Sequence, residues 1–211
     1  MRTEAPWVPW DPPPLAEAVR LLAPLRAPWW IAGGYAVELA VGRAHGRVHR
    51  EHADIDVLLL RRDQLEAQRV LPRWEWWAAD PPGTLRPWRA GEILPTGVHD
   101  IWCRPGAGEP WRLQFMLDDA DGEDWVFRRD PRVRLPLKRL GRVSGEGIPY
   151  LAPEVQLLYK SRSRRPKDEQ DFEAALPVLD DQGRAWLAET ITLTEGADHP
   201  WAVRLRALLA D

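Results

Sequence analysis

The stretch that decides the fold is Asp54-Ile55-Asp56-Val57-Leu58-Leu59-Leu60. Its β-branched and apolar residues predict a buried strand, and two carboxylates stand at the start of that strand. Because side chains alternate between the faces of a strand, Asp54 and Asp56 project to the same side while Ile55 enters the core. Acids are depleted in strands and like charges repel, so a purely structural role explains this pair poorly. The pair predicts a divalent-cation site, although an Asp-x-Asp motif is also found at strand edges in water.

A glycine pair lies about 20 residues upstream, in Ala32-Gly33-Gly34-Tyr35. Residues 28–31 before it form a short apolar run that predicts a strand, and residues 35–41 after it predict a helix that Gly42 ends. Glycines at a helix start let backbone N–H groups approach a phosphate at the positive end of the helix. A Gly-Gly pair alone is more often a tight turn. Its place just before the acidic strand favours phosphate chemistry.

The remaining elements follow from periodicity. Helical spacing is found at residues 15–25 and 61–70. Further strands, which continue the sheet as antiparallel hairpins, are expected at residues 98–103, 111–117 and 124–127. After Pro149 the periodicity becomes helical, and helices are expected at residues 153–164, 167–179, 182–190 and 199–209. We therefore predict an α+β fold with a mixed-sheet domain at residues 1–150 and a small helical domain at residues 151–211.

Composition places the chain among ordinary globular proteins. Of its 211 residues, 45% are hydrophobic and 29% are charged, which matches the averages for soluble domains. The formal net charge of -3 gives no basic surplus and argues against a nucleic-acid partner. Cys103 is the single cysteine, so no internal disulfide can form. Residues 1–14 lack a signal-peptide pattern and no apolar run reaches membrane-spanning length, so a cytoplasmic protein without a membrane partner is expected.

Three segments together carry a family resemblance: Trp30-Ile31-Ala32-Gly33-Gly34-Tyr35-Ala36-Val37, then Gly42-Arg43, then Arg50-Glu51-His52-Ala53-Asp54-Ile55-Asp56-Val57. This pattern resembles the nucleotidyltransferase superfamily of DNA polymerase β type, and most of all the aminoglycoside and lincosamide nucleotidyltransferases. The resemblance is specific over about residues 28–60 and makes residues 1–150 the catalytic domain.

The resemblance implies a reaction and its cofactors. Gly33 and Gly34 are expected to cradle the phosphates of an NTP, with ATP as the expected nucleotide. Asp54 and Asp56 are expected to hold Mg²⁺ between the triphosphate and the attacking hydroxyl. The implied activity moves a nucleoside monophosphate onto a hydroxyl of a small acceptor, such as an aminoglycoside- or lincosamide-like antibiotic.

Family members also use a third carboxylate from a neighbouring strand, as a metal ligand or as the general base. If residues 111–117 form that strand, Gln114 stands at the expected position, and an amide can ligate a metal but cannot accept a proton. Asp118 lies at the end of the same strand, and Asp100 lies on the strand before it. We favour Asp100 or Asp118 over Gln114.

Four basic or aromatic residues are further candidates for nucleotide contact. Only three of the 29 basic residues are lysines, so Lys160 and Lys167 stand out as compact cations suited to phosphate. The alternative is that both are surface charges, with Lys167 and Asp171 forming an i,i+4 pair. Arg50 and His52 precede the acidic strand and are assigned to phosphate contact or to orienting the loop.

The remaining hypotheses concern other ligands and partners. A zinc site formed by His45, His49 and His52 is the weakest, because Gly46 and Val48 favour a loop there. The acceptor is expected between the sheet and the C-terminal helices, near Glu154, Asp168 and Trp102. Alternatives to an antibiotic-type enzyme are a toxin-like relative acting on tRNA or protein and a noncatalytic nucleotide-binding relative. A monomer or a homodimer is compatible with the sequence.

Overall fold

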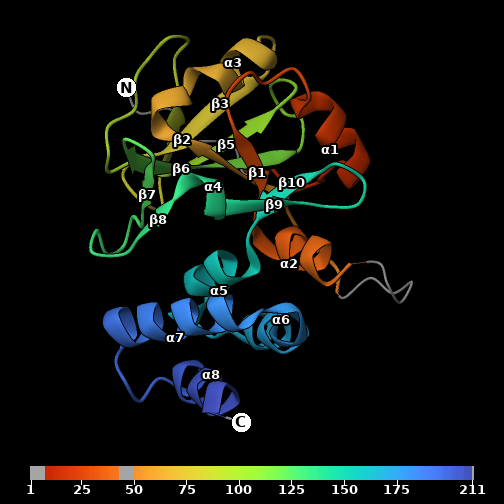
Figure 1. The fold of residues 1–211 in the computed structure, drawn as a ribbon. Helices are drawn as coiled ribbons and strands as arrows, with labels where there is room; N and C mark the ends of the chain where they lie inside the picture. Colours follow the sequence, from red (N-terminus) through yellow and green to blue (C-terminus); the bar gives the residue numbers. More distant parts are fainter. Residues whose placement is uncertain (1–7, 43–49, 211) are drawn as a thin grey trace.

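The computed structural model describes residues 8–42 and 50–210 (Figure 1). The helices are α1 (Leu15–Leu22), α2 (Gly33–Val41), α3 (Leu65–Val70), α4 (Leu137–Leu140), α5 (Pro153–Ser161), α6 (Pro166–Ala175), α7 (Asp181–Glu195) and α8 (Pro200–Ala210), with 3₁₀ turns η2 (Arg61–Asp63) and η3 (Leu176–Val178). The strands are β1 (Trp29–Ile31), β2 (Asp56–Leu60), β3 (Glu75–Ala79), β4 (Leu85–Pro87), β5 (Asp100–Arg104), β6 (Leu113–Asp121), β7 (Asp124–Val126), β8 (Arg134–Pro136), β9 (Gly141–Val143) and β10 (Pro149–Leu151).

One mixed sheet forms the centre of the molecule, with strand order β4-β3-β5-β6-β2-β1-β10-β9 and with β7 and β8 continuing from β6. Strand β2 pairs in parallel with β6 and antiparallel with β1. Residues 57–60 of β2 are fully buried, which explains why this strand is an uninterrupted apolar run rather than an alternating one. The predicted α+β class with a mixed sheet is confirmed.

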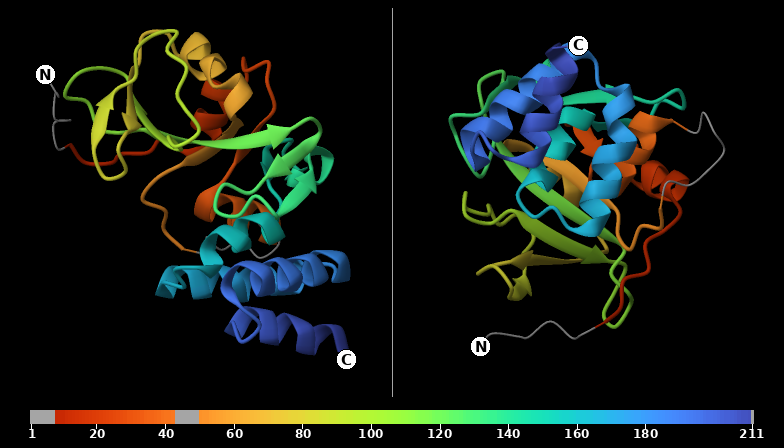
Figure 2. Two further views of the ribbon diagram at one scale, coloured as in Figure 1. Left: turned by 90° about the vertical axis from the view of Figure 1, so that its left-hand side faces the viewer. Right: turned by 90° about the horizontal axis from the view of Figure 1, so that it is seen from below.

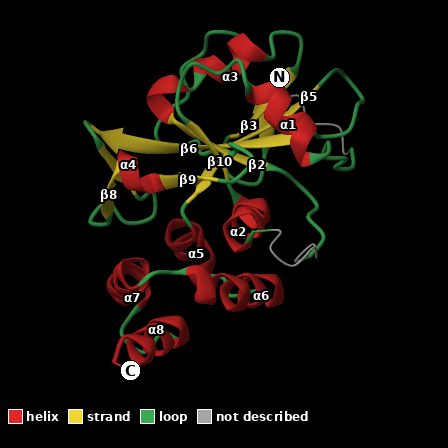
Figure 3. Cartoon of the chain, turned by 45° about the vertical axis from the view of Figure 1, so that its right-hand side comes forward, coloured by secondary structure: helices red, strands yellow, loops and turns green. Residues whose placement is uncertain are grey.

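Helices cover the two faces of the sheet differently. Helices α1 and α3 lie on one side, and α2 lies on the other, between the sheet and the C-terminal helices (Figures 1 and 3). Helix α2 packs on α5 and α6, and α5 packs on α7. The N-terminal arm runs beside the far end of the sheet, away from these helices, where Trp10 bridges to Trp111 (Figure 2).

The C-terminal part is helical, as predicted, and the chain leaves the sheet at Leu151. The proposed boundary near residue 150 therefore follows the last strand closely, although the independence of the two parts stays a prediction. Every residue of α5 is buried, so this helix is an integral part of the packing rather than a linker. No helix in the described ranges is both long and apolar enough to cross a bilayer.

Several sequence-based element boundaries were wrong. The helix expected at residues 61–70 is a 3₁₀ turn followed by the short α3. Strands β3 and β4 were missed, as were β8 and the hairpin of β9 and β10. The missed elements are three to five residues long, which is too short for a periodic pattern to be recognised.

The helical layer depends on an aromatic stack between α6 and α8. The rings of Phe172 and Trp201 lie 4.3 Å apart at an interplanar angle of 8°, and both side chains are buried. We predict that Phe172→Ala lowers the free energy of unfolding by about 3–5 kcal/mol, because it leaves a cavity beneath the indole. Val203→Ala, at an exposed position of α8, should change it little. Urea unfolding followed by circular dichroism measures both, and equal losses would contradict the stack's importance.

Candidate active site

The two acids lie where β2 begins. Asp56 is the first residue of the strand, and Asp54 lies two residues before it, outside the strand. Their mutual influence is visible in the pKa of Asp56, which rises to about 7. Burial is the main cause, and the negative charge of Asp54 adds to it. Lys160 opposes the increase, so its ammonium also lies within electrostatic range. A cation placed between the carboxylates would relieve this unfavourable charge.

Gly33 brings the start of α2 against Asp56. A Cβ atom on Gly33 would lie 2.2 Å from Asp56 Oδ2, and this glycine has a φ of +67°. A side chain is thus excluded both by the close approach and by the backbone conformation. The backbone N–H of Gly33 donates to Gln156 Oε1 at 2.7 Å. Gly33 therefore makes room for the acid, and its own amide is already used.

Gly34 makes room for two side chains from the segment before β2. A Cβ atom on Gly34 would lie 2.3 Å from both Arg50 Nη2 and His52 Nδ1. No described residue accepts a hydrogen bond from the backbone N–H of Gly34 or Tyr35. These two amides are open for an anion at the positive end of the helix.

Arg50 and His52 lie against Gly34 at the start of α2, and each pairs with an acidic residue. Arg50 donates to both carboxylate oxygens of Asp171, from Nε at 2.9 Å and from Nη2 at 3.0 Å. His52 Nε2 lies 2.7 Å from Glu38 Oε2, and its ring packs on Tyr35 at 4.2 Å. Burial lowers the pKa of His52, which favours the neutral ring at physiological pH. Both residues lie close to the predicted phosphate position, yet their visible contacts are internal. His45 and His49 lie outside the described residues.

The two candidate lysines differ in environment. Lys160 on α5 is buried, with Nζ 2.8 Å from Asp171 Oδ2 and 3.5 Å from Asp168 Oδ1. Lys167 at the start of α6 is exposed, and its positive charge partly opposes the increase in the pKa of Asp56. Both cations therefore lie within electrostatic range of Asp56, and both come from the helical part of the chain. Their assignment to nucleotide contact stays a prediction.

The two candidate third acids lie in different surroundings, although both are on the Asp56 face. Asp118 is fully buried, accepts from Trp125 Nε1 at 2.7 Å and from the Tyr159 hydroxyl, and has no partner for Oδ1 among the described residues. The side chain of Asp100 is 38% exposed and is near enough to raise the pKa of Asp56. Solvent access thus favours Asp100 over Asp118 for contact with substrate.

Register places Gln114 directly beside Asp56. Gln114 pairs with Asp56 on one side and with Trp102 on the other, so the three side chains share one face of the sheet. Trp102 is half-buried, and its ring contacts Trp10 at 5.1 Å and Trp111 at 5.6 Å. Glu154 and Asp168 are instead buried and paired with Arg142 and Arg165. Of the three residues expected near the acceptor, only Trp102 is accessible.

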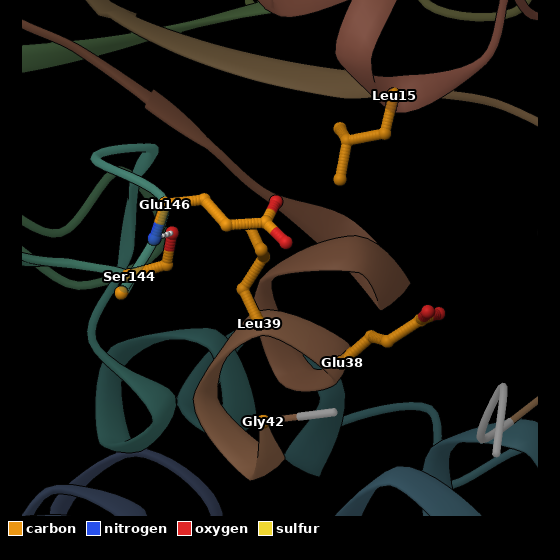
Figure 4. Close-up of a pocket in the computed structure, with 7 residues that line it drawn as sticks. Leu15, Glu38, Leu39, Gly42, Ser144 and Glu146 are labelled. Atoms are coloured by element: carbon orange, nitrogen blue, oxygen red, sulfur yellow. Dashed lines mark hydrogen bonds between the residues drawn. The ribbon is translucent and has the colours of Figure 1, made fainter. Parts of the chain in front are cut away.

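A pocket of about 370 Å³ opens elsewhere, between α1, α2 and the loop that joins β9 to β10 (Figure 4). Leu15 and Leu39 form its apolar wall, and Glu38 and Glu146 contribute carboxylates. Neither Asp54 nor Asp56 lines it, and none of the described residues that line it is basic. The acids are therefore a better candidate site for a triphosphate than this pocket.

The geometry agrees with one of the comparisons with known proteins. Residues 14–76 match the family model of the aminoglycoside-2''-adenylyltransferases, and this stretch contains the glycine pair and both acids. The match confirms the resemblance to the aminoglycoside nucleotidyltransferases. No curated protein matches the chain. The solution structure of the antibiotic-resistance factor ANT(2'')-Ia matches over 93% of this chain and 91% of that one, at 14% identity and a TM-score of 0.47. That similarity is too distant to indicate a shared reaction.

The contact at Gly33 predicts an effect on stability. Gly33→Ala should lower the free energy of unfolding by more than about 1 kcal/mol, because it adds a methyl group against Asp56 at a positive φ. The control is Gly106→Ala, where an added Cβ meets nothing within 4 Å and φ is not positive. Thermal and urea unfolding of both variants measures the difference. A Gly33→Ala protein as stable as the control would show that the acid does not press on the helix start.

Burial of Asp118 predicts a pH dependence. Desolvation raises its pKa above the ordinary value that applies in the unfolded chain, so the unfolded state loses this proton first. The contribution of Asp118 to stability therefore falls as pH rises from about 4, the ordinary value, through the folded-state pKa. Relative to Asp118→Asn, the wild-type protein should lose stability as pH rises above about 4. A stability difference that is constant over this range would contradict the prediction.

Proposed function

Since residues 14–76 relate the chain to the aminoglycoside nucleotidyltransferases, we propose that it moves a nucleoside monophosphate from an NTP, with ATP as the expected donor, to a hydroxyl of a small acceptor. The acceptor class that we propose is an aminoglycoside- or lincosamide-like antibiotic. One observation carries the proposal: Asp56 lies against the start of α2, where Gly33 has no side chain to exclude it, and Asp54 is near enough to raise the pKa of Asp56.

The residues at this point fit Mg²⁺. This ion prefers oxygen ligands and is often held by one or two carboxylates together with substrate phosphates, which suits two aspartates beside open helix amides. The pKa of Asp56 rises to about 7 first because of burial and then because of the negative charge of Asp54, and a bound cation would counteract both effects. Asp54 and Asp56 would hold the ion, which when bound supplies charge stabilisation to the phosphates.

The remaining residues of the site have separable roles. The open amides of Gly34 and Tyr35 receive a phosphate oxygen, and Lys160 on α5 and Lys167 on α6 supply positive charge. The acceptor oxygen forms a bond to the α-phosphorus as the bond to the bridging oxygen breaks, and pyrophosphate leaves with that electron pair. The hydroxyl proton passes to Asp100, the accessible carboxylate on the same face of the sheet.

The acceptor is placed over the strands next to the acids. Trp102 lies two strands from Asp56, which is about 10 Å at the usual strand spacing. An indole at that distance can pack on a sugar ring or a protonated amine while the reacting hydroxyl reaches the acids. Trp10 and Trp111 hold this indole in place.

A second candidate function is nucleotide binding without turnover. It is favoured by the finding that no three His, Cys, Asp or Glu side chains gather as a metal-binding group within residues 8–42 and 50–210. A relative that keeps the two aspartates but has no effective base would bind an NTP and transfer nothing.

The test is release of pyrophosphate with Mg²⁺, each of the four NTPs and a panel of aminoglycosides and lincosamides. We expect release with at least one pair, and Asp54→Asn or Asp56→Asn should lower kcat/KM by about 1,000-fold, because each removes charge that stabilises the transition state. Asp121→Asn is the matched control, since this exposed acid pairs with Arg134 at the far end of β6.

Three results would count against the proposal. Calorimetric NTP binding without pyrophosphate release for any acceptor favours the noncatalytic relative. Transfer of label from an NTP to RNA or protein in a lysate replaces the small acceptor with a macromolecule. Turnover that survives both aspartate substitutions would place the reaction elsewhere on the chain.

A further inference from the structure

The acids at the start of β2 leave a position beside them without a carboxylate. Within the described residues no third acid joins Asp54 and Asp56 in a metal-binding group. The residue in register with Asp56 on β6 is Gln114, which is half-buried and on the same face. Adjacent strands are about 4.8 Å apart, so Gln114 is the nearest β6 side chain to Asp56 on that face. Any third protein ligand from β6 would therefore come from an amide.

The amide of Gln114 has a defined orientation. Its Nε2 donates to Asp100 Oδ1 at 3.3 Å. Since the nitrogen and oxygen of an amide point in different directions, this bond turns Oε1 away from Asp100. A reversed amide would place Oε1 against a carboxylate, with two acceptors and no hydrogen between them. The strand on the other side of β6 from Asp100 is β2, whose Asp56 is in register with Gln114.

Asp100 is itself held in place. Arg128 Nη1 lies 3.5 Å from the same Oδ1 atom, and the Arg128 guanidinium lies 5.3 Å from the centre of the Tyr159 ring. The side chain of Arg128 is only 13% exposed, so its position is restricted by packing. Both of these contacts use Oδ1, so neither partner blocks the approach of an acceptor hydroxyl to Oδ2 of Asp100.

We propose that Gln114 Oε1 is the third protein oxygen ligand of the divalent cation and that Asp100 is the positioning residue that fixes this amide. The assignment rests on the proposed function, because it concerns the same site. A single carboxylate beside the metal could both bind the ion and accept the hydroxyl proton, and this assignment gives those two tasks to different residues. The amide supplies an oxygen but accepts no proton, and the acid one strand further away orients the amide.

Mn²⁺ binding in the presence of a nonhydrolysable ATP analogue tests the assignment without turnover. Calorimetry would compare the wild-type protein with Gln114→Leu, Asp100→Asn and the double variant. Asp100→Asn should weaken Mn²⁺ binding about 10- to 100-fold, the usual effect of losing a ligand's supporting contact, and Gln114→Leu, which removes the ligand, should weaken it at least as much. The double variant should bind no more weakly than the weaker single variant, because both changes remove the same interaction. The control is Asp121→Asn, which removes one negative charge, as Asp100→Asn does, but at the far end of β6. It should leave the Mn²⁺ affinity unchanged.

A conservative variant gives a second readout. Gln114→Glu keeps an oxygen ligand that needs no orientation, so Asp100→Asn in that background should not weaken Mn²⁺ binding and should relieve repulsion between two carboxylates. Gln114→Asn, which shortens the amide by one methylene, replaces Gln114→Leu if the leucine variant does not fold.

The outcomes distinguish this assignment from the proposed function. Additive losses in the double variant would mean that Asp100 acts only as a nearby charge. Wild-type affinity in Gln114→Leu would mean that the amide is no ligand. Either result overturns the assignment while pyrophosphate release would still support the transferase. A wild-type protein that binds no Mn²⁺ with nucleotide overturns both.

Discussion

The structure depends on one close approach, between the carboxylate of Asp56 and the backbone of Gly33. The acid lies where any side chain at position 33 would lie, and the positive φ of this glycine lets α2 begin at that point. Gly33 is held from the other side, since its N–H donates to Gln156 on α5. Strand β2, helix α2 and helix α5 are thereby joined at the point where Asp56 meets the start of α2.

Charge explains why the helical part belongs to this site. Asp56 is a partly enclosed carboxylate beside a second one, and the opposing cations Lys160 and Lys167 come from α5 and α6. The pairing of Arg50 with Asp171 ties the segment before β2 to α6. The C-terminal helices thus supply both the positive charge and the support that the acids need. Holding two carboxylates close together in a partly buried position costs free energy, and such arrangements are typical of sites that bind a cation or an anion.

Sequence reasoning found the features that are local. The Asp-x-Asp pair, the apolar run of β2 and the glycine-opened α2 each need only a few neighbouring residues, and all three were identified with nearly correct bounds. It missed what depends on distant partners: the burial of Asp118 against Tyr159, the capping of Gly33 by Gln156, and the internal pairing of Lys160. Its preference for Asp100 or Asp118 treated them alike, and only strand register shows that Gln114 lies nearest to Asp56 while Asp118 is sealed. Sequence reasoning also missed strand β3, which contains the Trp76–Trp77 pair.

The central claim is that two acids and the start of α2 form one binding site. A crystal structure with Mn²⁺ and a nonhydrolysable NTP tests it most directly, because the anomalous signal locates the ion. The account predicts Mn²⁺ in contact with both Asp54 and Asp56, with a phosphate at the backbone amides of Gly34 and Tyr35. Mn²⁺ bound away from these acids, or a nucleotide seated in the pocket between α1 and α2, would contradict it.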